Sequence, residues 1–166
     1  MCAIDAVANM FLVERARRLL ARQTVGIASE YLEADDLLIV VWHGPISGDD
    51  WEQFVLRRLA DDPTWPPGKR RLADLTTLDP SLLSAADVET VIPHYRERLQ
   101  NLAGSRQAIV ATEGWELART FERRIDQLGA TTIVFNDVEA ACAWLAIDPV
   151  SARQVIDRLR AGLREP

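Results

Sequence analysis

The sequence predicts an α/β fold: a single domain with a mostly parallel five-stranded sheet, an N-terminal β-hairpin and crossover helices, plus extra N- and C-terminal helices. The chain has 166 residues, 48% of them apolar and 27% charged, which suits one domain with a sizeable core. From residue 25 onward, short β-branched runs alternate with longer amphipathic stretches, as strands do when helices connect them. No internal repeat is present, so one domain accounts for the alternation.

The first two strands are predicted to form a hairpin. Residues 25–33 alternate weakly between apolar and polar side chains, and residues 34–36 (Ala-Asp-Asp) supply a turn. Residues 37–43 (LLIVVWH) form a continuous apolar run, which is typical of a strand covered on both faces. The sheet is therefore expected to carry helices on both sides near this strand.

Two crossover helices follow in the first half. The first is predicted to begin at SGDDWE, where Ser47 or Asp49 can cap it, and to end within residues 61–68. A strand over residues 70–75 leads to a second helix, announced by Ser84 with Asp87 three residues later, as in a capping box. Pro93 predicts a kink or a restart within that helix. The expected core-facing residues are Trp51, Phe54, Val55, Leu59, Val88, Val91, Ile92, Tyr95, Leu99 and Leu102.

The second half predicts strands over residues 107–112 and 131–135, each followed by a helix. The helix between them is expected to bury Leu117, Ala118, Phe121, Ile125 and Leu128 and to leave Arg119, Glu122, Arg123 and Arg124 outside. Asn136 is predicted to cap the next helix, which buries Val138, Ala141, Cys142 and Leu145. Asp148 and Pro149 open a terminal helix with Val155, Ile156, Leu159 and Leu163 as its apolar side.

These elements divide the chain into a helical extension over residues 1–23, the main domain over 24–147 and a C-terminal helix over 148–166. The net charge is −6 without a clustered basic face, which predicts no nucleic-acid partner. Cys2 and Cys142 have no second ligand at metal spacing, so both are expected to be reduced thiols in a cytoplasmic protein without a metal site. No apolar run reaches membrane-spanning length, and no stable membrane insertion is expected.

The carboxyl ends of the strands are the expected functional face, because loops and helix N-termini converge there in parallel sheets. The candidate residues on this face are His43, Asp74, Thr76, Thr77, Ser81, Ser84, Thr112 and Asn136. The glycines form neither a dinucleotide-binding nor a phosphate-binding loop, and the GxSxG motif is absent, so no cofactor is predicted. An enzymatic alternative would rest on His43, Asp74 and Thr112, which lack a partnered nucleophile; no catalytic residue is predicted. Trp65, flanked by prolines, is expected either to pack or to offer an exposed anchor.

Three stretches give the chain a resemblance to a known family: RRLADLTTLD (70–79), QAIVATEGWELARTFERRIDQLGA (107–130) and IVFNDVEAACAWL (133–145). Over roughly residues 25–147, judged by strand and helix signals, the chain resembles the STAS domains of anti-sigma-factor antagonists and sulfate transporters. It is more similar to a divergent STAS-like group linked to the CRAL-TRIO lipid carriers. The resemblance implies a non-enzymatic, regulatory protein of the bacterial cytoplasm.

This resemblance also implies a role for serine and two kinds of ligand. In antagonist-type STAS domains a serine after strand three, within an Asp-Ser pair, is phosphorylated and so switches partner binding. Here the region is Asp79-Pro80-Ser81 with Ser84 beyond, so proline interrupts the pair, and the hydroxyls are expected to cap and brace a loop. The predicted function is binding to a protein partner or a second copy of the chain. The alternative is a small-molecule or lipid carrier with an internal apolar pocket.

Overall fold

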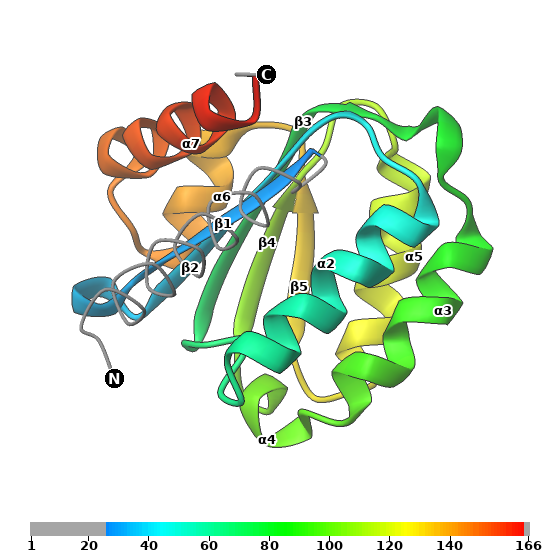
Figure 1. Cartoon of the computed structure of the whole chain (residues 1–166). Coiled ribbons are helices and arrows are strands. Elements are labelled where there is room, and N and C mark those ends of the chain that lie inside the picture. Colours follow the sequence, from blue (N-terminus) through cyan, green and yellow to red (C-terminus); the bar gives the residue numbers. More distant parts are fainter. Residues whose placement is uncertain (1–25, 165–166) are drawn as a thin grey trace, which may run out of the picture.

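The computed structural model describes residues 26–164, and over this range a five-stranded sheet lies between two layers of helices (Figure 1). The strand order is β1-β2-β3-β4-β5, with β1 antiparallel to β2 and the other neighbours parallel. The strands are β1 (Ile27–Leu32), β2 (Leu37–Pro45), β3 (Arg70–Asp79), β4 (Arg106–Val110) and β5 (Thr131–Phe135). The predicted fold class is confirmed for these residues, whereas the predicted extension over 1–23 lies outside them.

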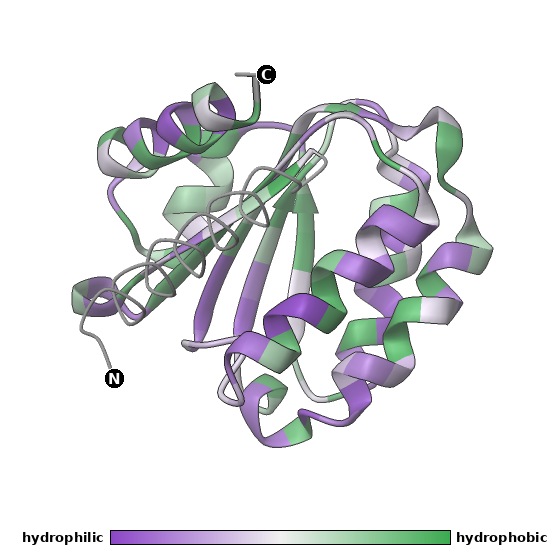
Figure 2. Cartoon of the chain, viewed as in Figure 1, coloured by the Kyte–Doolittle hydropathy of each residue, from purple (hydrophilic) through white to green (hydrophobic). Residues whose placement is uncertain are grey.

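The helices divide between the two faces of the sheet (Figure 1). One face carries α2 (Gly48–Asp61), α3 (Ala85–Arg96), the short α4 (Leu99–Leu102) and α5 (Trp115–Asp126); the other carries α6 (Val138–Leu145) and α7 (Pro149–Arg164). Short 3₁₀ turns, η1 (Glu33–Asp35) and η2 (Pro80–Leu82), follow β1 and β3. The green, apolar parts of the ribbon lie mainly in the strands and along the helix sides that face the sheet, as amphipathic helices require (Figure 2).

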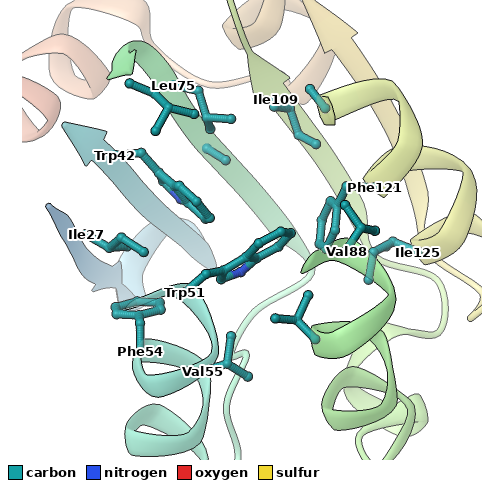
Figure 3. Packing of buried hydrophobic residues seen from close by; sticks show 14 of the residues in the cluster. Ile27, Trp42, Trp51, Phe54, Val55, Leu75, Val88, Ile109, Phe121 and Ile125 are labelled. Carbon is teal, nitrogen blue, oxygen red and sulfur yellow. The ribbon is translucent and has the colours of Figure 1, made fainter. Parts of the chain in front are cut away.

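The two sides of the sheet have different cores. The α2–α3–α5 side is rich in rings, and Trp51 packs edge-on against Trp42 at 5.1 Å between ring centroids and at 5.4 Å against Phe121 (Figure 3). The α6–α7 side buries small and aliphatic residues: Leu37, Ile39, Val41, Leu72, Ala108, Val110, Val138, Ala141, Cys142, Leu145, Ala152, Val155 and Ile156. Burial of Cys142 raises the pKa of its thiol to about 11, so the predicted reduced thiol is also unreactive.

Local capping signals predict the starts of α2 and α3 correctly. Ser47 caps α2, with its hydroxyl accepting from the backbone N–H of Asp50 at 3.2 Å, while the Asp50 carboxylate accepts from the Ser47 N–H at 2.9 Å. The Asp87 carboxylate likewise accepts from the backbone N–H and hydroxyl of Ser84, at 2.7 and 2.8 Å. Side chains only three residues apart thus fix both helix starts.

The cap predicted for α6 is wrong by one residue. Asp137, not Asn136, is the N-cap, and its carboxylate accepts from the backbone N–H of Ala140 at 2.7 Å. The backbone at Asp137 is extended, with φ −143° and ψ 154°, which is the conformation that points a cap side chain at the first helical turn. Because β5 ends at Phe135, Asn136 only joins the strand to the cap.

Strand β3 is longer than the sequence predicts, since it continues past Leu75 to Asp79. The extension pairs with the end of β2, where His43 lies opposite Thr77 after a register shift between Val41 and His43. Asp74 and Thr77 are three residues apart on β3, whereas their partners Val41 and His43 are two apart on β2, so the extra residue is a bulge in β3 that realigns the two strands. Thr76 and Thr77 accordingly belong to a strand and not to a loop.

Two predicted side-chain orientations are also wrong. Helix α3 continues through Pro93 and ends at Arg96, so the chain restarts as α4 and leaves Leu99 45% exposed, while Leu102 is buried. Glu122 is buried, although an outside position was predicted, and burial raises the pKa of its carboxyl. Arg119, one turn earlier, forms an ion pair with it and compensates part of the charge.

Candidate functional site

Asp74 lies at the centre of the strand-end face and is fully buried. Alternation along β3 places it on the α6–α7 side, next to Leu72 of the aliphatic core. There the guanidinium of Arg160, from α7, donates to its carboxylate at 2.5 Å, and the Arg160 side chain is 20% exposed. The predicted face thus contains a buried ion pair whose arginine comes from the C-terminal helix.

Thr76 completes the contacts of Asp74. Its hydroxyl donates to the second carboxylate oxygen of Asp74 at 2.8 Å and accepts from Arg160 at 3.2 Å. The Thr112 hydroxyl donates to the backbone carbonyl of Thr76 at 3.4 Å, which links β4 to the same point. The carboxylate therefore has partners on both oxygens, an arrangement that fixes α7 to the sheet.

The remaining predicted residues do not join this group. The Thr77 hydroxyl donates to the Trp42 carbonyl at 3.2 Å, and the Ser84 hydroxyl is engaged with Asp87. Ser81 is exposed, and its backbone N–H donates to Asp79 at 3.0 Å, which lowers the pKa of the Asp79 carboxyl. Half-buried His43 is held through its backbone N–H, which donates to the Gly26 carbonyl at 2.7 Å, and Asn136 is exposed.

Two large apolar side chains are exposed on the connections at this end of the sheet. Leu82, in η2 after β3, is 59% exposed, and Trp115, at the start of α5 after β4, is 37% exposed. The two connections touch, because a Cβ on Gly114 would lie only 3.3 Å from the Cβ of Pro80. We call Leu82, Trp115 and Pro80, which lies where the two connections meet, the strand-end patch. Sequence analysis singled out the hydroxyls here and missed these apolar neighbours.

An interior cavity of about 70 Å³ lies in the ring-rich core, between the sheet and α2, α3 and α5. Its aromatic lining comprises Trp42, Trp51, Phe54, Trp65, Tyr95 and Phe121. A second cavity of about 30 Å³ shares Trp65 and Tyr95 with the first and is also lined by Arg71. Trp65 is 5% exposed and packs against Phe54 and Tyr95 at 6.2 and 5.7 Å between ring centroids, which confirms the packing alternative for this residue.

Comparison with known proteins yields a similarity of fold. No protein-family model and no curated protein matches the chain. Among solved structures, an uncharacterized protein from the DUF3478 family with a SpoIIAA-like fold, from Shewanella loihica PV-4, has 25% sequence identity and a TM-score of 0.47, covering 72% of this chain and 94% of that one. The name of that protein gives no ligand or partner.

Within residues 26–164, no helix combines the length and apolar character that a bilayer span needs. The same residues hold no group of three or more His, Cys, Asp or Glu side chains arranged for a metal ion.

Proposed function

We propose that this STAS-like domain acts without catalysis, by binding a protein partner or a second copy of itself through the strand-end patch. The observation that carries the proposal is the exposure of Leu82 and Trp115 on adjoining connections. Leucine and tryptophan lose apolar surface to a partner, and tryptophan is enriched among the residues that dominate binding energy. We place this binding in the cytoplasm, in keeping with the unpaired, buried thiol of Cys142.

The polar groups at this end of the sheet support binding more than catalysis. Asp74, the strongest candidate base, has Thr76 and Arg160 on its two carboxylate oxygens and no exposed surface. A general base must reach a substrate proton, and this carboxylate is already occupied. Exposed Ser81 and Thr112 flank the patch and can supply rim hydrogen bonds to a partner.

The test is native mass spectrometry of the protein purified gently from its own cells, as wild type and as the variants Leu82→Glu, Trp115→Glu and Val150→Glu. Val150 is the matched control because it is 62% exposed but lies on α7. We expect a stoichiometric protein complex or dimer that both patch variants lose and Val150→Glu keeps. A monomer under all conditions, or a complex that survives both patch substitutions, would contradict the proposal.

Phosphorylation of Ser81 or Ser84 would be the regulatory form of this function. Both side chains are exposed and precede α3, but Asp79 and Asp87 lie beside them. A phosphate here would repel these carboxylates and break the Ser84–Asp87 contact, so modification would loosen the start of α3. The same mass spectra measure added phosphate, and unmodified serines in every growth state would remove this regulatory form.

A second candidate function, small-molecule binding, is favoured by the interior cavity. A water molecule needs about 10–15 Å³ of such space, so the larger cavity has room for about five waters, which is the liquid volume of roughly one benzene ring. A lipid acyl chain is several times larger. The cavity therefore favours a small ligand over the lipid carrier that the sequence left open.

A further inference from the structure

Arg71 and the rings around it suggest what such a small ligand would be. Residues Arg71, Ala73 and Leu75 alternate toward the α2–α3–α5 side of β3, and Arg71 lines the smaller of the two cavities. Its side chain is nearly inaccessible, since the residue is only 4% exposed. A positive charge is thus buried at the edge of an aromatic cavity.

The partners of Arg71 satisfy hydrogen bonds but are uncharged, and Asp36 compensates the charge only in part, through the coulombic attraction that favours the charged guanidinium. Its terminal nitrogens donate to the Ser105 hydroxyl at 2.7 Å and to the backbone carbonyls of Pro66, Gly68 and Asn101 at 2.9–3.0 Å. Among the described residues it forms no ion pair with a carboxylate. Burial lowers the pKa of Arg71 to about 10, so the guanidinium is still charged at neutral pH. Buried charges are normally paired, which makes this arginine an exception.

Two hydrogen-bond donors in the cavity walls have no acceptor. The Nε of Arg71 and the indole Nε1 of Trp65 are both buried without a hydrogen-bond partner, although both residues line the smaller cavity. Trp65 also lines the larger one, so it connects the polar end to the ring-lined space. Water could accept from these donors, but it would not compensate the charge. The missing partner is thus an acceptor with a negative charge.

We infer that the cavity binds a small aromatic carboxylate, with its ring among the aromatic side chains and its carboxylate toward Arg71 and Trp65. The larger cavity has the volume of about one six-membered ring, and the smaller, with room for about two waters, has that of a carboxylate group. Rings prefer edge-on or offset contacts with other rings, and a guanidinium prefers a carboxylate. This inference rests on the second candidate function, small-molecule binding, and is independent of the strand-end patch.

The probe for the experiment is 4-fluorobenzoate, added to the full chain and followed by ¹⁹F NMR and by the indole N–H resonances. Its neutral isostere 4-fluorobenzamide has the same ring and shape without the charge. We expect saturable binding of the acid and at least about tenfold weaker binding of the amide, because a charge-assisted hydrogen bond is lost. Equal binding of the two would overturn the carboxylate inference while leaving small-molecule binding in place, and binding of neither would overturn both.

Three variants locate the site. Trp65→Phe keeps a ring but removes the unpartnered N–H, and should weaken the acid severalfold, whereas Trp144→Phe removes an indole on the opposite, α6–α7 side of the sheet and should leave affinity unchanged. Ala118→Leu adds side-chain volume to the cavity wall and should abolish binding while the circular dichroism spectrum stays native. Acid binding that Ala118→Leu does not reduce would place the ligand elsewhere and refute the site.

Discussion

An arginine side chain lies against each face of β3, Arg71 from the strand itself and Arg160 from α7, and the two charges are compensated in different ways. On the α6–α7 side Arg160 reaches fully buried Asp74, and opposite charges meet at 2.5 Å. On the α2–α3–α5 side Arg71 meets only a hydroxyl and carbonyls. Complete compensation fixes one helix to the sheet, whereas incomplete compensation leaves a charge that a ligand can satisfy.

The side chains that pack around the two arginines also differ between the two faces of β3. Small and aliphatic side chains such as Ala141 and Leu145 interdigitate on the α6–α7 side and are fully buried. On the opposite side large, rigid rings such as Trp42, Trp51 and Trp65 meet edge-on or tilted, and cavities lie between them. The α6–α7 side also borders a pocket of about 160 Å³, lined by Leu37, Arg70 and Ala152, so the α2–α3–α5 side is distinguished by the aromatic lining of its cavities.

The largest expected effect is the loss of the Asp74–Arg160 pair. Replacing Arg160 with leucine leaves the carboxylate of Asp74 buried without its cation, so the free energy of unfolding should fall by about 3–5 kcal/mol. Arg158→Leu is the matched control on the same helix, because Arg158 is 59% exposed and pairs with Glu30 at the surface. That substitution should cost about 0–1 kcal/mol. Urea denaturation measures both, and similar costs would show that the buried pair is no stronger a link than a surface one.

Two alanine-to-leucine substitutions, one on each side of the sheet, test the difference in packing. Ala141→Leu adds side-chain volume at a position with no exposed surface in the aliphatic core, and should destabilise the protein by about 1–3 kcal/mol through overpacking. Ala118→Leu adds the same volume beside the aromatic cavity, and should be neutral or stabilise by about 0.5–2 kcal/mol. Thermal and urea unfolding of the two helix variants give the comparison. If the two variants lose the same stability, the aromatic cavity cannot accommodate the added side-chain volume.

Much of the fold was predictable because its signals are local. The hairpin follows from two β-rich runs around Asp35 and Asp36, and the starts of α2 and α3 follow from Ser47 and Ser84 with an aspartate three residues later. Each of these signals joins residues that are neighbours in the chain, so no tertiary information is needed. The extension of β3 depends instead on pairing with the end of β2 across a bulge in β3, and a partner strand that is distant in sequence leaves no local signal.

The chemistry of the interior was less predictable because its partners are distant in sequence. Asp74 and Arg160 are 86 residues apart, and only the packing of α7 on the sheet brings them together. A signal for Arg160 did exist, since it lies four residues after Ile156 and three before Leu163, on the apolar side of the terminal helix. Arg71 alternates with Ala73 in the same way. Periodicity therefore identifies both arginines as inward-facing, but it gives neither their partners nor the volume of a cavity.

The smallest expected effect on stability concerns the N-caps of the helices on the two faces of the sheet. Helix α6 begins with a side-chain cap at Asp137, while α5 begins at Gly114, with φ 70° and no side-chain cap. Asp137→Ala should therefore cost about 1 kcal/mol, because the Ala140 N–H loses its acceptor. Asn136→Ala, one residue earlier, should change stability by less than about 0.5 kcal/mol. Urea unfolding of both variants separates the two positions, and the reverse order would mean that Asn136 caps α6 in solution, as its sequence pattern had suggested.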